Sequence, residues 1–214
     1  MLKLGNLELH QLFSVPVGIV RMPKLDSKTK EKLINNKEVV QRPNSNSPND
    51  TLVLLNDFTQ LKNDITDQVN SFVKGCLGYS NALDFKMTNS WVSKQPPGEQ
   101  VYMHNHANSL ISAVYYLTTP PNCGRLIVHR RKHYDNVFSE TVEIPVENYT
   151  PVAASGWPFE VEEDMLIMFP SNLEHSVEPN SSDTDRYSLA SNFFAFGEFG
   201  YNKVKQLEIK EWND

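Results

Sequence analysis

The sequence predicts a mostly β fold with helices near its N-terminus, of the jelly-roll or small-barrel type. From about Phe85 onwards, apolar residues recur with strand-like spacing in about eight short segments, and turns rich in Gly, Pro and Asn separate them. Before that point, one segment carries apolar residues at helical spacings of three and four. We therefore expect a helical layer packed on an all-β core, an α+β arrangement overall.

The first fifty residues are expected to contribute one edge strand and one short helix. Residues 7–20 alternate loosely, and Pro16 favours an edge position because proline cannot donate a ladder hydrogen bond. A charged helix is predicted over residues 26–35. Residues 41–50 are rich in Pro, Ser and Asn, which is typical of an exposed loop.

The clearest helical pattern covers residues 57–77. Its apolar residues form a single stripe, which indicates a helix covering the outer face of a sheet. Asn56 or Asp57 can cap its start, and Gly78 can end it.

The predicted strands follow one another between residues 85 and 196, and the turns between them contain Pro-Pro-Gly, Pro-Pro-Asn and Phe-Pro-Ser. We expect a single domain over residues 1–214, with an N-terminal strand and helical layer over 1–84, the core over 85–197 and a tail over 198–214. The predicted strands are Phe85–Ser93, Gln100–His106, Leu110–Leu117, Arg125–Val128, Val142–Val146, Phe159–Phe169, His175–Val177 and Tyr187–Phe196.

The composition of the 214 residues is that of an ordinary globular protein, with 39% hydrophobic and 21% charged residues. The net charge of −6 disfavours nucleic acid as a partner, because such binding needs a basic surface that releases counterions. The N-terminus lacks the pattern of a signal peptide, and no apolar run reaches the ~18–20 residues that span a bilayer. We expect a cytoplasmic chain without membrane association, and its oligomeric state is open.

Three histidines form a candidate metal site. His104 and His106 stand two residues apart on a predicted strand, so that their side chains point to the same face and can hold one ion together. His175 follows the turn at Pro170, which lies where a jelly roll opens and ligands usually bind. The alternative is that the pair simply belongs to a polar strand edge.

Arg186, Ser188 and Asn192 share one face of the last predicted strand. An arginine that faces into a sandwich is costly unless it meets an anion, and its planar fork suits a carboxylate. The Ser188 hydroxyl can add a further hydrogen bond. The alternative is a surface ion pair of Arg186 with Asp183 or Asp185.

These motifs, in this order, resemble the 2-oxoglutarate and Fe(II)-dependent dioxygenases. The similarity covers roughly residues 85–197 and is greatest to a largely uncharacterised branch near the prolyl hydroxylases, found in bacteria and phages. The residues that carry the resemblance are Pro97-Gly98, His104, His106, Asn108-Ser109, Ser112, Tyr115-Tyr116, Phe169-Pro170, His175, Pro179-Asn180, Arg186, Ser188 and Asn192.

The resemblance implies a double-stranded β-helix that holds Fe(II) at its open end. His104 and His175 match the family's two histidine ligands, and Arg186 with Ser188 matches its clamp for the far carboxylate of 2-oxoglutarate. It implies decarboxylation of 2-oxoglutarate to succinate with O2 as co-substrate, ascorbate as reductant in vitro, and hydroxylation of a protein side chain, prolyl or other, or of a small metabolite. Further candidates are Tyr102 and Tyr115 at the co-substrate and Asn89 and Trp91 in the substrate pocket.

The sequence departs from the family at the expected carboxylate ligand. Two residues after His104 the chain has His106 instead of Asp or Glu. Either His104, His106 and His175 form the triad, which we favour because imidazole suits Fe(II) better than an amide, or Asn108 joins His106 while His104 supports them. Asn192 is a candidate for the same supporting role or for an alternative ligand.

Two other functions fit part of the pattern. A cupin-like three-histidine dioxygenase would need no 2-oxoglutarate, but the clamp of Arg186 and Ser188 would then have no ligand. A jelly roll that binds a metal or another ligand without catalysis is the second alternative.

Overall fold

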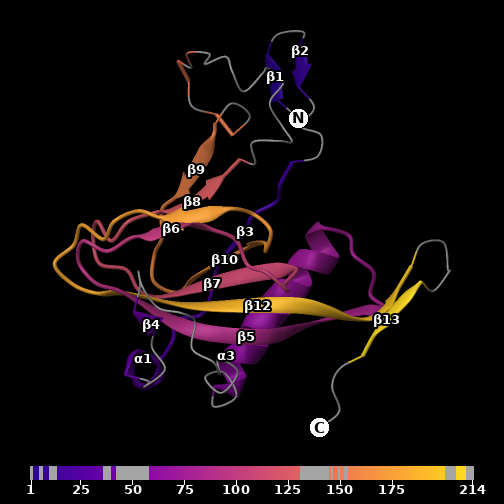
Figure 1. The fold of residues 1–214 in the computed structure, drawn as a ribbon, viewed down its shortest axis with the longest axis horizontal. Helices are drawn as coiled ribbons and strands as arrows, with labels where there is room; N and C mark the ends of the chain where they lie inside the picture. The colour runs from indigo at the N-terminus through magenta and orange to yellow at the C-terminus, as the bar shows by residue number, and fades with distance from the viewer. Residues whose placement is uncertain are drawn as a thin grey trace.

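The structure is a computed structural model that describes residues 2–4, 7–9, 14–35, 40–41, 58–130, 145, 147–148, 150–151, 154–200 and 206–210. Its centre is a pair of facing sheets, and Figure 1 shows the smaller sheet above the larger one. The predicted mostly β, jelly-roll fold class is confirmed.

The larger sheet is antiparallel except where β4 joins β5 in parallel. Its strands, in spatial order, are β3 (Gly18–Arg21), β10 (Met165–Pro170), β7 (Ile111–Thr118), β12 (Arg186–Phe199), β5 (Leu83–Gln95) and β4 (Val40–Gln41), and β13 (Leu207–Ile209) pairs with β12.

The smaller sheet is antiparallel and carries part of the histidine site. Its strands, in spatial order, are β6 (Val101–His104), β11 (His175–Val177), β8 (Leu126–His129) and β9 (Gly156–Phe159). A separate antiparallel hairpin is formed by β1 (Leu2–Leu4) and β2 (Leu7–Leu9).

Helix α3 (Thr59–Asn70) continues directly into the π-helical segment η1 (Ser71–Cys76), and together they cover the outer face of the larger sheet. Leu61, Ile65 and Val69 of α3 are buried in one cluster with residues of β5, β7 and β12. The segment ends at Gly78, whose φ of +71° is a left-handed conformation that glycine adopts without a steric penalty. The helix predicted over residues 57–77 is confirmed as a helical segment, although its last part is π-helical.

The short helix α1 (Ser27–Ile34) begins at the cap Asp26, whose side chain accepts a hydrogen bond from the Thr29 N–H at 2.9 Å. It confirms the charged helix predicted over 26–35. None of the helices that the structure describes is long and apolar enough to cross a membrane.

Alternation along each central strand divides the larger sheet into an outer face and an inner face. On the outer face, Tyr115 and Leu189 pack with the helical layer. On the inner face, Tyr116, Ile167 and Phe169 pack with residues of the smaller sheet. The inner face is therefore the side on which a ligand would lie between the sheets.

Most predicted strands occur, with three differences. The segment predicted as one strand over 159–169 is divided into β9 and β10 by a turn in which Asp164 has a φ of +60°. The strand predicted to reach His106 ends at His104, and Pro16 precedes the edge strand β3 without lying in it. Most of the strand predicted over 142–146 and of the loop predicted over 41–50 lies outside the described residues.

Candidate metal centre

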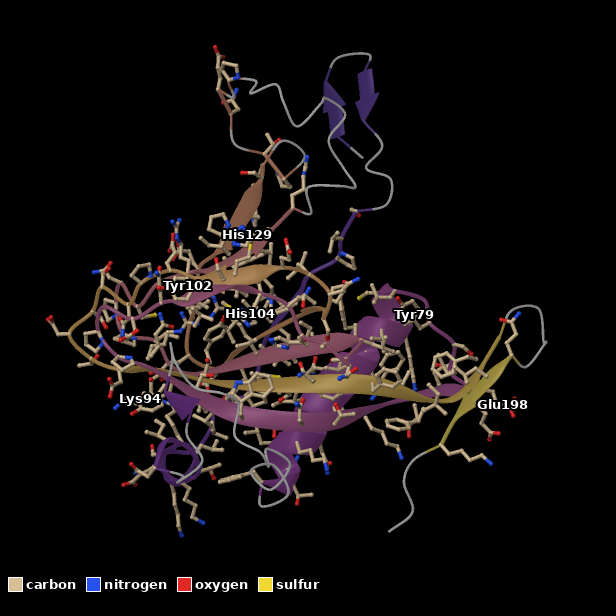
Figure 2. The ribbon with its side chains drawn as sticks, in the orientation of Figure 1. Tyr79, Lys94, Tyr102, His104, His129 and Glu198 are labelled. Atoms are coloured by element: carbon tan, nitrogen blue, oxygen red, sulfur yellow. The ribbon has the colours of Figure 1, made fainter. Side chains whose placement is uncertain are left out.

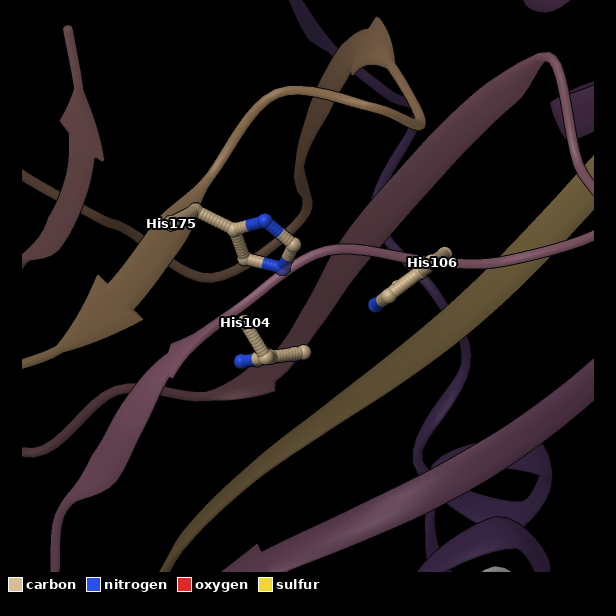
Figure 3. A group of neighbouring side chains, drawn as sticks. All are labelled: His104, His106 and His175. Carbon is tan, nitrogen blue, oxygen red and sulfur yellow. The ribbon is translucent and has the colours of Figure 1, made fainter. Parts of the chain in front are cut away.

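The three predicted histidines converge on one point between the sheets (Figure 3). One ring nitrogen from each of His104, His106 and His175 lies within 4.8 Å of the others. The ring centroids are 4.3 Å apart for His104 and His175, 5.0 Å for His106 and His175, and 5.3 Å for His104 and His106. The three donor atoms are therefore close enough together to bind a single metal ion.

Strand pairing places two of the histidines opposite each other. His104 ends β6 and His175 begins β11, and these two residues are partners in the antiparallel register. His106 lies beyond the end of β6, where its backbone N–H donates to the Ser171 carbonyl at 2.9 Å. That bond ties the segment after β6 to the turn after β10, so His106 reaches the site from a loop.

Hydrogen bonds to backbone carbonyls set the tautomers of two rings. The Nδ1 of His104 is 2.8 Å from the Tyr102 carbonyl oxygen, and the Nδ1 of His175 is 2.9 Å from the Leu173 carbonyl oxygen. A carbonyl only accepts, so each Nδ1 carries the proton and each Nε2 carries the lone pair that can bind a metal. Metal-binding histidines usually have such a partner on the other nitrogen.

His106 is held by side chains. Its Nδ1 is 2.7 Å from Asn192 Oδ1 and 2.8 Å from Ser112 Oγ. Ser112 also donates to Asn192 Oδ1 at 2.9 Å and contacts Ser171 Oγ at 2.8 Å, and Ser109 lies 2.7 Å from the same Ser171 oxygen. Residues of β12, β7 and two loops thus fix the orientation of the His106 ring. Asn192 contacts the ring at Nδ1, which makes Nε2 the nitrogen that can bind a metal.

His175 is buried and stays neutral. Burial, with the neighbouring His104 and His106 adding to it, lowers the pKa of His175 to about 3. Its ring is therefore uncharged near neutral pH, the form in which imidazole binds a metal.

Among the described residues, the candidate metal group contains three imidazoles and no carboxylate. Asn108 takes a φ of +54° in an exposed turn, so it does not continue the strand face that the alternative ligand set required. The geometry favours His104, His106 and His175 as the ligands. Three neutral donors leave a divalent ion its full +2 charge, which attracts an anionic co-substrate.

Arg186 is buried on the inner face at the start of β12, with 2% of its surface exposed. Its Nη1 donates to the Gly124 carbonyl at 3.1 Å, and the guanidinium lies 5.0 Å from the centroid of the Tyr116 ring. Its Nε and the Tyr116 hydroxyl are both buried, and neither has a hydrogen-bond partner in the described part of the chain. A buried cation and an unpaired hydroxyl side by side are the kinds of group that bind a carboxylate.

The alternative surface ion pair of Arg186 is wrong. Asp185 pairs with Lys94 at 2.9 Å, and Asp183 is exposed while Arg186 is buried. Asp185 and Arg186 are consecutive at the start of β12, where successive side chains point to opposite sides, so the arginine is buried and the aspartate pairs with Lys94.

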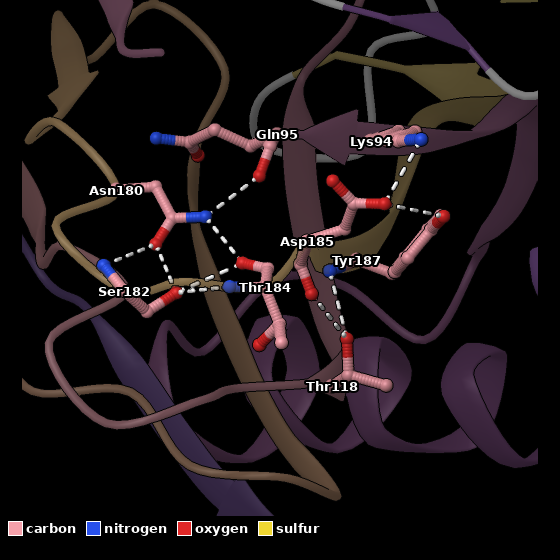
Figure 4. A network of polar contacts seen from close by, with 8 residues as sticks. All are labelled: Lys94, Gln95, Thr118, Asn180, Ser182, Thr184, Asp185 and Tyr187. Carbon is pink, nitrogen blue, oxygen red and sulfur yellow. Dashed lines mark hydrogen bonds and ion pairs between the residues drawn. The ribbon is translucent and has the colours of Figure 1, made fainter. Parts of the chain in front are cut away.

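A network of hydrogen bonds fixes the turn that leads into Arg186 (Figure 4). Asn180 is fully buried, and its Nδ2 donates to the carbonyls of Gln95 and Thr184, each at 2.9 Å. Its Oδ1 accepts from the Ser182 N–H and hydroxyl at 3.1 and 2.6 Å. The turn rich in Asn, Ser and Asp therefore serves to set the start of β12.

Tyr115 does not lie at the predicted co-substrate site. Its ring is buried on the outer face with the helical layer, and its hydroxyl donates to Asp164. Burial, reinforced by Asp164, raises the pKa of Tyr115 far above its usual range. The next residue, Tyr116, faces the opposite way and lies beside Arg186. The two residues have opposite orientations because side chains alternate along β7.

Tyr102 and His104 share one side of β6, and both are labelled in Figure 2. Tyr102 is 67% exposed. Ser188 is half-buried on the inner face of β12, two residues from Arg186. Asn89 and Trp91 lie on the inner face of β5, and the Trp91 ring is 5.5 Å from the His106 ring.

Sequence reasoning named Ser112 and Tyr116 only as residues that carry the resemblance, without a role in the site, and it did not name Ser171. Ser112 and Tyr116 are four residues apart on β7, so they share a face, and this parity could have identified both. Ser171 lies in a turn, where no periodic signal marks a side chain that points inward.

We expect Asn192→Leu to lower the affinity for Co(II) by about 10- to 100-fold, because the His106 Nδ1–H loses its acceptor and the ring its fixed orientation. Calorimetric titration of the metal measures the change. Ser191→Ala is the matched control, since the Ser191 hydroxyl is buried without a partner among the described residues, on the other face of β12. Equal affinities of both variants would show that Asn192 does not orient His106.

Residues 89–192 match the model of a protein family described as "Putative 2OG-Fe(II) oxygenase". A search of curated proteins found no match. Among solved structures, AviO1 from Streptomyces viridochromogenes is 12% identical, with 91% of this chain and 93% of that chain covered and a TM-score of 0.53. HygX from Streptomyces hygroscopicus, solved with nickel and 2-oxoglutarate bound, is also 12% identical, with 84% and 81% covered and a TM-score of 0.51.

The chain also matches a 2OG-Fe(II) oxygenase family oxidoreductase from Burkholderia pseudomallei at 15% identity and a TM-score of 0.48. The match covers 72% of this chain and 63% of that chain. It thus spans less than two thirds of this relative. Identities this low speak for the fold alone, and the fold shared with AviO1 and HygX is the double-stranded β-helix that the motifs predicted. Together, the family match over residues 89–192 and the fold shared with AviO1 and HygX make this chain similar to the 2-oxoglutarate and Fe(II)-dependent oxygenases.

Proposed function

We propose that the chain is an Fe(II)- and 2-oxoglutarate-dependent oxygenase that hydroxylates a small molecule or a peptide side chain. The observation that carries the proposal is the buried Arg186, whose Nη1 donates to the Gly124 carbonyl while its Nε has no hydrogen-bond partner in the described part of the chain. An enzyme that needed only the metal would have no use for a buried arginine on the inner face that has no anionic partner among the described residues.

The donor atoms present fit both groups that the proposal requires. Three imidazoles, with protonated Nδ1 atoms held by oxygens, suit Fe(II) and leave positions open for further ligands. The Arg186 guanidinium and the Tyr116 hydroxyl suit the far carboxylate of 2-oxoglutarate, since both present donors that have no partner. The resident metal would supply oxidative chemistry with O2 and the keto acid.

The protein itself positions and shields the reactants. Arg186 and Ser188 would hold the co-substrate, with Arg186 fixed by the turn around Asn180, so that the keto acid meets the histidine face in one orientation. Phe169 is fully buried and packs 4.8 Å from the His175 ring, which keeps water from that side of the centre.

The test is turnover of 2-oxoglutarate by purified protein supplied with Fe(II), ascorbate and O2. We expect succinate to form slowly without a substrate, and 2-oxoglutarate to bind only when metal is present. Binding that does not depend on the metal would favour a ligand-binding module, and metal-dependent O2 consumption without 2-oxoglutarate would favour a cupin-like dioxygenase.

Tyr116→Phe is expected to weaken 2-oxoglutarate binding about two- to tenfold, the range for loss of one hydrogen bond. Burial raises the pKa of Tyr116 to about 12, so its hydroxyl is a protonated donor at neutral pH. Calorimetry with the Co(II)-loaded protein measures the change.

The adjacent Tyr115→Phe serves as the control. It removes a hydroxyl from the outer face, so we expect unchanged 2-oxoglutarate affinity and a lower thermal midpoint, because Asp164 loses one of its donors. If both variants bind 2-oxoglutarate like the wild type, Tyr116 does not contact the co-substrate.

A further inference from the structure

We propose that Trp91 and Asn89 form a subsite for an amide group of the substrate, in which the indole N–H donates to the amide carbonyl and the Asn89 side-chain oxygen accepts from the amide N–H. This inference rests on the proposed oxygenase function, because it takes the histidine centre as the place where the substrate reacts.

The indole N–H of Trp91 is a buried donor without a partner. The side chain is 9% exposed, and its Nε1 has no hydrogen-bond partner among the described residues. The ring lies 5.5 Å from the His106 ring and packs on Ala190 of β12. Tryptophan N–H groups normally find a partner when they are buried, so an unpaired one beside a candidate metal ligand points to a ligand.

The side-chain oxygen of Asn89 is a buried acceptor, also without a partner in the part of the chain that the structure describes. Asn89 pairs in register with Asn192, the residue that accepts from His106. It stands two residues before Trp91 on the same face of β5, about 6.6–6.8 Å along the strand. The donor therefore lies beside His106, and the acceptor lies opposite the residue that orients His106.

The position of the pair separates it from the co-substrate clamp. Along β12, the partners of Asn89 and Trp91 are Asn192 and Ala190, whereas Arg186 lies four residues before Ala190 and pairs with Gln95. The small side chain of Ala190 lies under the Trp91 ring, between the clamp and Asn192 along β12. A group held by Trp91 and Asn89 would lie at the metal end of this face, away from the clamp.

One donor and one acceptor select an amide. A carboxylate has no donor for Asn89, and its charge would face the amide oxygen at close range. An ester satisfies Trp91 and leaves the Asn89 oxygen unpaired, which is costly in a buried site. An extended peptide residue directs its own N–H and C=O to the same neighbour, and a small carboxamide also offers both groups.

The experiment follows the indole signals of the full chain, loaded with Zn(II) and 2-oxoglutarate and labelled with 15N at its tryptophans. The chain has three tryptophans, and loss of one signal in Trp91→Phe assigns that residue. The probes are N-acetylglycine N-methylamide, its depsipeptide analogue in which the glycine N–H is replaced by oxygen, and acetamide as a small carboxamide. We expect the peptide to shift the Trp91 indole proton to higher frequency in a saturable manner.

We expect the depsipeptide to bind about two- to tenfold more weakly than the peptide, and Asn89→Leu to remove this difference. Trp91→Phe should weaken both probes, whereas Trp157→Phe, which removes an indole from β9, should weaken neither. A response to acetamide as strong as that to the peptide would assign the subsite to small carboxamides instead of peptides.

Three results would overturn the inference: a Trp91 signal that does not respond to any amide, one that responds fully to 2-oxoglutarate alone, or equal binding of peptide and depsipeptide. Calorimetry on the same sample separates these from failure of the proposed function. If 2-oxoglutarate does not bind the metal-loaded wild type, the oxygenase proposal fails; if it binds and the amide does not, only the subsite fails.

Discussion

His106→Ala is expected to lower the affinity for Co(II) or Fe(II) by about 100-fold or more, whereas Asn108→Ala leaves it within about twofold. Loss of a ligand should cost more than loss of a residue that only supports a ligand, which itself costs about 10- to 100-fold. His106 contributes a ring nitrogen to the converging group, and Asn108 lies in an exposed turn. Anaerobic calorimetry measures both affinities.

Both variants must be compared in folded protein. His106 is half-buried, and its removal leaves Asn192 and Ser112 bonded to each other, so we expect the thermal midpoint without metal to change little. A loss of affinity in Asn108→Ala as large as the loss in His106→Ala would favour the ligand set of His106 and Asn108.

His106→Asp tests the same position in the opposite direction. Aspartate supplies the carboxylate that the superfamily pattern has two residues after its first histidine, and it lowers the charge of the occupied centre by one unit. We expect the variant to keep the metal and to bind 2-oxoglutarate more weakly, because the centre attracts the dianion less. Tighter 2-oxoglutarate binding by the variant would contradict this electrostatic reasoning.

Local patterns were sufficient to predict much of the fold and the core of the site. The spacing of apolar residues predicted the helix against the larger sheet, and proline and glycine located the turns between strands. His104 and His175 were identifiable because each lies at the end of a short strand next to a turn. Arg186 was identifiable because an inward-facing charge is rare enough to require an explanation.

Other parts of the site depend on contacts that a sequence does not display. His106 was assigned by strand alternation, yet β6 ends at His104 and a loop bond to Ser171 places the third imidazole. Tyr115 was named at the co-substrate, yet Tyr116 is the tyrosine of β7 that faces Arg186, and a shift of one residue in register reverses every side chain. The Asn192 contact joins residues 86 positions apart, which only the folded sheet brings together.

Arg186→Ala is expected to weaken 2-oxoglutarate binding by at least about 100-fold, the loss that follows when two charge-assisted hydrogen bonds disappear. The guanidinium is buried on the inner face with an unpaired Nε, so bulk water cannot replace it there. Metal affinity should stay the same, because Arg186 contacts Gly124 and Tyr116 and none of the histidines. Calorimetry with Co(II) first and 2-oxoglutarate second measures the two affinities separately.

Two further variants distinguish the geometry of the clamp from its charge. Arg21→Ala removes one positive charge from the exposed edge strand, where Arg21 pairs with Glu162, so it changes the net charge equally and should leave 2-oxoglutarate affinity unchanged. Arg186→Lys keeps the charge but loses the planar fork, and we expect an intermediate loss. Wild-type 2-oxoglutarate affinity in Arg186→Ala would leave the buried arginine without a carboxylate to bind, and the cupin-like dioxygenase would then be the better account of the three histidines.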